Sequence, residues 1–500
     1  MTVVDNVETA KDPKALAARA MQALADGSEA ALLPLLAATA RRIRDNALLW
    51  QCTGLLSRAL DRHSEALVAF GHAARLAPAD PKIAYGWAQV ALEAGVDSVA
   101  LFERARRLNS GVGTVHLGMA AARFAVGDSV RALAELDDLL RRNPAWIEGH
   151  AGLVRLRAMM GERDRITESL DRALAAQPRN FELWRALILT LIEGEHHAQA
   201  HAAISRGRAA IGGNVFFDAN EATVLSEAGD VARADALFAR VAHVDEEVLA
   251  VRHVRHLLRT GRADQALPLV DQWVDRPGAA LIWPNAAIAW RLTGDSRQQW
   301  LEGDERLVSV IDLADRLPEF DHIATTVRNL HHARAQPLDQ SVRGGTQTDG
   351  QLFQRIDPVI QVLRGIIVEA VEAHLAQLPP IDPKHPTLRH RRGQTVRFAG
   401  AWSVRLADAG YHANHVHPSG WISSALYVAL PGEGERGGAQ AGWLTLGEPQ
   451  RALGLDLAPA RVIEPRLGRL VLFPSTMWHG TRPFARGERL TIAFDIARPS

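Results

Sequence analysis

The sequence predicts a multidomain α + β protein in which an α-helical repeat solenoid is followed by a β-sandwich or barrel. From about Pro13 the chain is rich in Ala and Leu, and short Gly-Asp, Gly-Glu or Pro-Ala breaks recur at a regular distance. After about residue 380 it changes to short alternating segments separated by turns rich in Gly and Pro. We place the solenoid at residues 13–300, a helical linker at 301–336 and the second domain at 337–500.

Composition narrows the class of protein. The chain has 500 residues, which favours two or three domains, with 57 basic and 57 acidic side chains. A formal net charge of zero gives no global attraction to nucleic acid or to membranes, so we expect neither as a partner. One cysteine, Cys52, excludes an internal disulfide framework and fits a reducing compartment. With no visible signal peptide or long apolar run, we expect a cytoplasmic protein.

The helical part repeats at one constant spacing. The same distance along the chain separates Pro144 from Pro178, Ala66 from Ala100, and Ala200 from Ala234. One window carries an alternation of large and small side chains at Trp50, Gly54, Ala66, Phe70, Ala73 and Pro78. In these features the chain resembles the tetratricopeptide family, whose unit is a helix-turn-helix of about 34 residues. The resemblance implies seven or eight units between Pro13 and Gln299. Two segments, 98–109 and 264–272, depart from the repeat period by about two residues each.

Arrays of this kind bury their cores by stacking and form a concave groove. We expect the groove either to bind an extended peptide or protein or to act as a docking or dimerisation platform, and the repeats favour both equally. The array also contains clustered histidines without a cysteine or carboxylate at ligand spacing, so we expect surface or packed residues rather than a metal site. These are His196, His197, His253 and His256.

Three segments lead into the second domain. Residues 303–336 predict one or two further helices, and the Gly/Thr-rich segment 341–350 predicts a tight turn at the domain entrance. Residues 358–378 predict one amphipathic helix. The strands then expected are Thr395–Leu406, Ile422–Leu430, Gly442–Leu446, Arg461–Ile463, Leu470–Phe473 and Leu490–Ile496.

The histidines near the C-terminus predict a mononuclear metal site. His415 and His417 are separated by one residue, and side chains at i and i+2 of a strand point to the same face. His479 ends another expected strand, and Arg489 lies on the next. Imidazole suits iron, copper, nickel and zinc, and three protein ligands leave positions open for substrate and oxygen. His412 is expected to face away from this site in a regular strand.

Further motifs accompany these histidines: Gly344–Thr348, Trp402–Leu406, Tyr411–Pro418, Gly420–Ser424, Leu472–Ser475, Trp478–Thr481 and Arg489–Asp495. With them, the segment from about Pro337 to Ser500 resembles the iron- and 2-oxoglutarate-dependent oxygenases, in particular a family often fused to tetratricopeptide repeats. The resemblance implies a double-stranded β-helix, or jelly roll, with Fe(II), 2-oxoglutarate and O2. It assigns His415 and His479 to two metal ligands, His417 to the position of the carboxylate ligand, and Arg489 to the far carboxylate of 2-oxoglutarate.

The departure from that family is the absent acid, because His417 is neutral where an aspartate or glutamate is expected. Three alternatives remain open. All three histidines bind the metal, or His417 lies behind the ligands or binds substrate while water completes the site, or the site is non-catalytic or holds zinc. Asp408 and Asp495 are the nearest carboxylates in sequence, and a turn would be needed to bring either to the metal.

Other residues near the site have two interpretations each. Tyr427 is a candidate donor to 2-oxoglutarate or a buried packing residue, and Asn414 and Ser423 are candidate contacts to cosubstrate or substrate. Of three tryptophans, we expect two to fill the core and one to line a pocket. These are Trp402, Trp421 and Trp478.

The function expected from these observations is that of an Fe(II)- and 2-oxoglutarate-dependent dioxygenase, a hydroxylase acting on a peptide or protein side chain presented by the repeats. The alternative is a tetratricopeptide scaffold whose three-histidine barrel is inactive or independent of 2-oxoglutarate.

Overall fold

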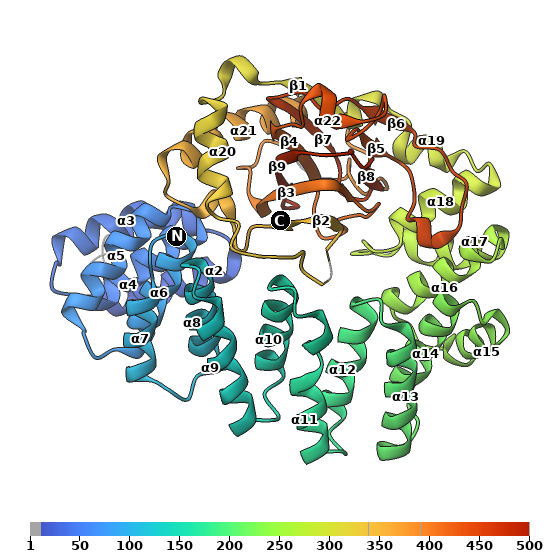
Figure 1. The fold of residues 1–500 in the computed structure, drawn as a ribbon. Coiled ribbons are helices and arrows are strands. Elements are labelled where there is room, and N and C mark those ends of the chain that lie inside the picture. Colours follow the sequence, from blue (N-terminus) through green and yellow to red (C-terminus); the bar gives the residue numbers. More distant parts are fainter. Residues whose placement is uncertain (1–11, 339, 391, 500) are drawn as a thin grey trace. The chain divides into compact units, whose positions relative to one another are not determined.

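The computed structural model describes residues 12–338, 340–390 and 392–499 (Figure 1). The chain forms two compact units: one from the described residues up to Leu139 with Asp349–Gln361, the other from Leu140–Thr348 with the described residues from Val362 onward. The boundary between these units falls inside the repeat array. The division into 13–300, 301–336 and 337–500 follows the type of structure instead and stays a prediction.

The first unit is helical, and its helices begin where the repeat period places a capping side chain. Asp12, Asn46 and Asp80 are spaced by exactly one period each, and every one accepts a hydrogen bond from a backbone N–H group of the first turn. The helices are α2 (Pro13–Asp26), α3 (Glu29–Arg42), α4 (Ala47–Ala59), α5 (His63–Leu76), α6 (Pro81–Glu93), α7 (Val99–Leu108) and α8 (Gly113–Ala125), followed by α9 (Ser129–Arg142), which crosses into the second unit.

Phe70 of α5 shows why the repeats need small residues. Its ring is fully buried between Gly54 of α4 and Gly86 of α6, where an added Cβ would come within 2.6 and 2.5 Å of the ring. Large and small positions therefore interlock between successive helices, as predicted. The left-handed residues Gly95 and Gly127 lie slightly less than one period apart, and α7 between them is a short helix. The first expected break in the period is confirmed.

The helical part of the second unit continues the pattern, with Asn180 and Asn214 again capping helices one period apart. Together with the first unit, the described helices up to α19 form nine successive pairs, more than the seven or eight predicted. The second shortening lies between Gly229 and Gly261, before rather than within 264–272. The helices are α10 (Ile147–Met159), α11 (Glu168–Ala176), α12 (Phe181–Glu193), α13 (His197–Ile211), α14 (Val215–Ala228), α15 (Val231–Val241), α16 (Glu247–Arg259), α17 (Ala263–Val274), α18 (Trp283–Thr293) and α19 (Arg297–Glu302).

Two antiparallel sheets follow in the second unit, of strand order β1-β7-β4-β9-β3-β2 and β6-β5-β8. The helices beside them are α20 (Phe320–Arg328), α21 (Pro358–Gln377), which begins in the first unit, and α22 (Glu433–Arg436). The strands are β1 (Ser309–Asp312), β2 (Val342–Gln347), β3 (Phe398–His412), β4 (Ile422–Ala429), β5 (Leu444–Leu446), β6 (Arg461–Ile463), β7 (Arg469–Pro474), β8 (His479–Thr481) and β9 (Glu488–Ile496). A jelly-roll type of sandwich, as predicted, agrees with this antiparallel arrangement.

Two strands occupy segments that the sequence assigns to other structures. β1 lies in the expected helical linker and pairs with β7. It was not predicted because a strand this short carries too little periodicity to be recognised. β2 lies in the expected loop and pairs with β3. Its glycines permit this pairing: a Cβ on Gly345 would lie 2.4 Å from the carbonyl oxygen of Arg405, and Gly344 has a φ of 71° at a bulge.

The end of the repeat array packs against the β region within the second unit. Trp478 is buried with Trp283 and Trp290 of α18, and its indole donates to the carbonyl of Pro284 at 2.8 Å. Trp421 is also buried and donates to the carbonyl of Thr387, so two of the three tryptophans fill cores as predicted. In the described part of the chain, no helix combines the length and hydropathy that a membrane span requires.

Candidate metal centre

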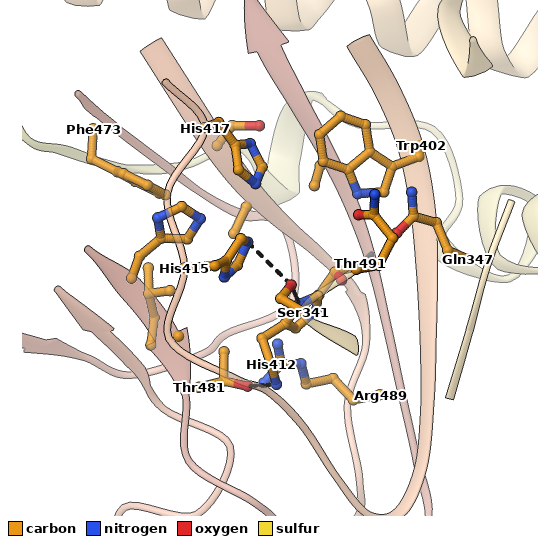
Figure 2. Close-up of a pocket in the computed structure, with 17 residues that line it drawn as sticks. Ser341, Gln347, Trp402, His412, His415, His417, Phe473, Thr481, Arg489 and Thr491 are labelled. Carbon is orange, nitrogen blue, oxygen red and sulfur yellow. Dashed lines mark hydrogen bonds between the residues drawn. The ribbon is translucent and has the colours of Figure 1, made fainter. Parts of the chain in front are cut away.

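Three histidines from two segments of the chain converge in one pocket (Figure 2). His479 opens β8 and exchanges two backbone hydrogen bonds with His415, of 2.9 and 3.0 Å, which form an isolated bridge. The N–H of His417 donates to the carbonyl of Ser475 at 2.9 Å. His415 and His417 are therefore held by backbone contacts of an irregular segment rather than by a strand. One potential ligand atom from each of the three side chains lies within 4.8 Å of the others.

Hydrogen bonds fix the same tautomer in all three rings. Nδ1 of His415 lies 2.9 Å from the carbonyl oxygen of Ala413, and Nδ1 of His479 lies 3.0 Å from that of Met477. Nδ1 of His417 faces the carboxylate of Asp495 at 2.7 and 2.9 Å. These oxygens only accept, so Nδ1 carries a proton in each ring and Nε2 is the nitrogen left for a metal ion.

Electrostatics favour the neutral imidazoles that a metal ion requires. Burial, with the neighbouring histidines, holds the pKa of His415 well below its ordinary value. Burial, followed by the charge of His417, lowers the pKa of His479 to about 3. Three Nε2 lone pairs grouped in a partly buried pocket form a nitrogen donor set that fits a divalent transition metal such as iron or zinc.

Arg489 lines the same pocket from β9 and is 2 % exposed. Its guanidinium donates to the carbonyl of Gly442 at 2.9 Å, while Nε has no hydrogen-bond partner. The guanidinium lies 5.6 Å from the ring of Tyr427, whose fully buried hydroxyl also lacks a partner. Burial lowers the pKa of Arg489 and raises that of Tyr427. Arg489 therefore lines the pocket without a complete set of partners, and Tyr427, which is outside the pocket lining, lies behind it with an unpaired hydroxyl.

Asn414 and Ser423 lie outside this pocket lining. The amide of Asn414 donates to the carbonyl of Pro449 at 2.9 Å. Ser423 donates to Asp495 at 2.6 Å and lies 2.9 Å from the hydroxyl of Ser475. Both side chains have hydrogen bonds within the protein, which explains why neither is turned toward the histidines.

His412 lines the pocket, contrary to the prediction that it faces away. That prediction assumed a regular strand, whereas Ala409 has a φ of 62° and β3 is irregular where it pairs with β2. Ser341 connects His412 to the three histidines, because its hydroxyl lies 3.0 Å from Nδ1 of His412 and 3.1 Å from Nε2 of His415 (Figure 2). The turn signal Asp-Ala-Gly at 408–410 was the only sequence hint of this bulge.

The β region matches a known family. Residues 400–495 fit the model of the family 2OG-FeII_Oxy_5, described as "Putative 2OG-Fe(II) oxygenase". The resemblance predicted from the sequence is confirmed for this segment, which covers about a fifth of the chain and is called the oxygenase domain below. The matched residues contain His415, His417, His479 and Arg489. No curated protein matches the chain.

Several solved structures share local architecture with the chain at low identity. A tetratricopeptide repeat protein from Parabacteroides merdae is 16 % identical, with 47 % of this chain and 95 % of that chain covered and a TM-score of 0.31. YrrB, described as a TPR protein with an unusual peptide-binding site, is 16 % identical over 36 % and 93 % of the chains, with a TM-score of 0.29. A Pseudomonas putida prolyl-4-hydroxylase is 17 % identical over 39 % and 94 %, with a TM-score of 0.27.

Proposed function

We propose that the chain is an Fe(II)- and 2-oxoglutarate-dependent dioxygenase that hydroxylates a peptide or protein side chain presented by the tetratricopeptide array. The observation that carries this proposal is the buried guanidinium of Arg489 beside three converging histidines. Its hydrogen bond goes to the neutral carbonyl of Gly442, and no described carboxylate forms an ion pair with it. A buried cation is stabilised by an anionic partner, and a planar guanidinium suits a carboxylate.

The residues divide into two roles. His415, His417 and His479 would hold Fe(II) through Nε2, and the bound metal would supply the positions and the redox chemistry for dioxygen and the keto acid. Arg489 would bind the far carboxylate of 2-oxoglutarate, and the hydroxyl of Tyr427 would donate to the same group. Both interactions would satisfy polar atoms that otherwise stay buried without partners.

The other end of the pocket suits the substrate. The ring of Trp402 lies 5.6 Å from that of His417, and Gln347 lies beside it, whereas Arg489 lies toward His412 (Figure 2). An indole wall with a primary amide, which both donates and accepts, is suited to an uncharged group such as a peptide unit. We therefore assign this side to the substrate and infer a peptide or protein partner in the groove of the repeats. A cytoplasmic location stays a prediction from the sequence.

Anaerobic titration with Fe(II) and then 2-oxoglutarate tests this proposal through the visible metal-to-ligand charge-transfer band. We expect the band in the wild type and its loss in Arg489→Ala at the same 2-oxoglutarate concentration, because the distal carboxylate loses its cation. The matched control is Arg405→Ala, since Arg405 is about half exposed and paired with Glu488 at 2.5 Å. A wild type without the band, or an unchanged band in Arg489→Ala, would contradict the proposal.

A second candidate is favoured by His417, which makes the ligand set neutral. A three-histidine dioxygenase that needs no 2-oxoglutarate would consume oxygen with its substrate alone. Oxygen uptake by the Fe(II)-loaded protein with a peptide library, with and without 2-oxoglutarate, separates the two candidates. Uptake only with 2-oxoglutarate supports the first, and equal uptake in both conditions supports the second. A scaffold without activity would consume no oxygen in either condition.

A further inference from the structure

The negative charge absent from the ligand position is present directly behind it. Asp495 of β9 is 8 % exposed, and its two oxygens lie 2.9 and 2.7 Å from Nδ1 of His417. Nδ1 of the other two histidines faces neutral backbone carbonyls. Among the three candidate ligands, His417 is therefore distinguished by a carboxylate on its far side.

A network of hydroxyl groups holds Asp495 in place. Ser423 of β4 is the residue opposite Asp495 in the sheet and donates to it at 2.6 Å. Ser475 lies 2.9 Å from the Ser423 hydroxyl, and its carbonyl accepts the backbone N–H of His417 at 2.9 Å. The same network thus holds both the backbone of His417 and, through Asp495, its ring.

Gly420 lets the histidine segment approach this network closely. An added Cβ there would lie 2.6 Å from the hydroxyl oxygen of Ser475 and 3.3 Å from Cβ of Asp495. The turn is closed by the N–H of Gly420, which donates to the carbonyl of His417 at 2.9 Å. Any larger residue at 420 would displace the hydroxyl or the carboxylate.

The charge of Asp495 is directed at the imidazole rather than neutralised elsewhere. Its side-chain partners are His417 and the hydroxyl of Ser423, and within the described chain no Lys or Arg forms an ion pair with it. Carboxylates behind ligand histidines fix the tautomer, orient the ring and raise its basicity.

We propose that Asp495 is a positioning residue that gives His417 the electrostatic role of the carboxylate ligand that the chain lacks. This inference rests on the proposed function, because it requires a metal at the three histidines. Asp495 does not touch the metal; it holds the Nδ1 proton of His417 and places a negative charge on the far side of the imidazole ring. Asp495, which the sequence offered as a carboxylate that a turn could bring to the metal, instead lies on strand β9 and contacts Nδ1 of His417.

Cobalt(II) binding to the metal-free full-length protein tests the inference without turnover. Competition with a chromophoric chelator gives the affinity, and the visible d–d spectrum reports on the ligand field. We expect Asp495→Asn to weaken Co(II) binding by about 10- to 100-fold and to shift the spectrum, since Asn keeps an acceptor but removes the charge. The matched control is Asp312→Asn, which removes an exposed carboxylate of the same sheet and should change neither quantity.

A double-mutant cycle shows whether Asp495 acts through His417. We expect Asp495→Asn to add no further loss of affinity in a His417→Ala background. If Asp495→Asn does not fold, Ser423→Ala keeps the charge but frees the carboxylate, and an affinity loss of a few-fold is then expected.

Three results would overturn the inference. Wild-type affinity and spectrum in Asp495→Asn, or unchanged affinity in Ser423→Ala, would reject the role of Asp495 while leaving the metal centre intact. An equal loss of Co(II) affinity from Asp495→Asn with and without His417 would show that Asp495 acts on the fold. A wild type that binds no Co(II) would instead reject the proposed function, and this role with it.

Discussion

His150 and His256 of the repeat helices are each 1 % exposed, and His479 of the oxygenase domain is 6 % exposed. In these two repeat histidines both ring nitrogens have protein partners: those of His256 lie 2.8 Å from the Ser226 hydroxyl and 2.9 Å from Asp235. His150 is similarly held at both nitrogens. In the oxygenase domain Nδ1 of His479 is bound to a backbone carbonyl, and its other nitrogen belongs to the group of converging ligand atoms.

The comparison teaches that burial does not distinguish a structural histidine from a ligand. The deciding feature is whether nitrogens from several rings converge on one point, because the Ser341 hydroxyl also lies 3.1 Å from Nε2 of His415. Within the described residues, His415, His417 and His479 form the group suited to a metal, and the repeat histidines do not join one. His256, one of the histidines predicted to be packed or surface residues, is buried and hydrogen-bonded within the array.

The largest expected effect is on metal binding. His479→Ala removes one of three converging nitrogens, and we expect Fe(II) affinity to fall by more than about 100-fold, beyond the range of changes behind the ligands. Metal content after equilibrium dialysis measures it. His256→Ala is the comparison from the repeats and should retain the wild-type metal content. Loss of iron from His256→Ala, or retention of iron by His479→Ala, would contradict the distinction between structural and ligand histidines.

For the stability of the metal-free protein, we expect the repeat histidine His256 to be important. His256→Ala leaves the hydroxyl of Ser226 without its partner and removes one contact of Asp235, so the free energy of unfolding should fall by about 1–3 kcal/mol. Denaturant unfolding of the metal-free protein checks this value. The control is His243→Ala, because His243 is exposed and its ring contacts the carbonyl of Arg240. Equal stability in the two variants would show that His256 does not support the fold.

The smallest expected effect is the contribution of His253, in the repeats, to the pH dependence of the unfolding free energy. Burial, followed by the charge of His256, lowers the pKa of His253 to about 4, and its ring stacks on Phe238 at 4.7 Å. Asp235 opposes this shift and Arg262 adds to it. The unfolded chain takes up a proton near pH 6.5 while the folded chain does not, so stability falls as pH drops from about 6.5 to 4.

His253→Gln should reduce that dependence. The measurement is the difference in unfolding free energy between pH 7.5 and 5, compared between wild type and variant. A variant with the full wild-type pH slope would show that His253 is not responsible.

The regular features of the molecule were predictable from sequence, and the irregular ones were not. The repeat period, the break near α7 and most strands follow from local spacing. β2 was missed because its pairing depends on two glycines that admit the carbonyl of Arg405. His412 was misplaced because the left-handed Ala409 reverses the alternation of β3.

The candidate site shows the same limit. The convergence of His415 and His417 was expected from strand alternation, yet it arises from a backbone bridge between His415 and His479, which lie far apart in the sequence. The role of Asp495 required knowing that β9 lies beside β4, which no local pattern encodes. Long-range pairing therefore decides the details that matter for the chemistry.

The central claim, a metal held by three Nε2 atoms, is tested most directly by a crystal structure of the full-length protein grown anaerobically with Fe(II) and 2-oxoglutarate. The account predicts iron bonded to His415, His417 and His479 at about 2.0–2.2 Å, with Asp495 still on Nδ1 of His417 and 2-oxoglutarate paired with Arg489. Iron bound by Asp495 itself, or by only two of the histidines, would contradict it.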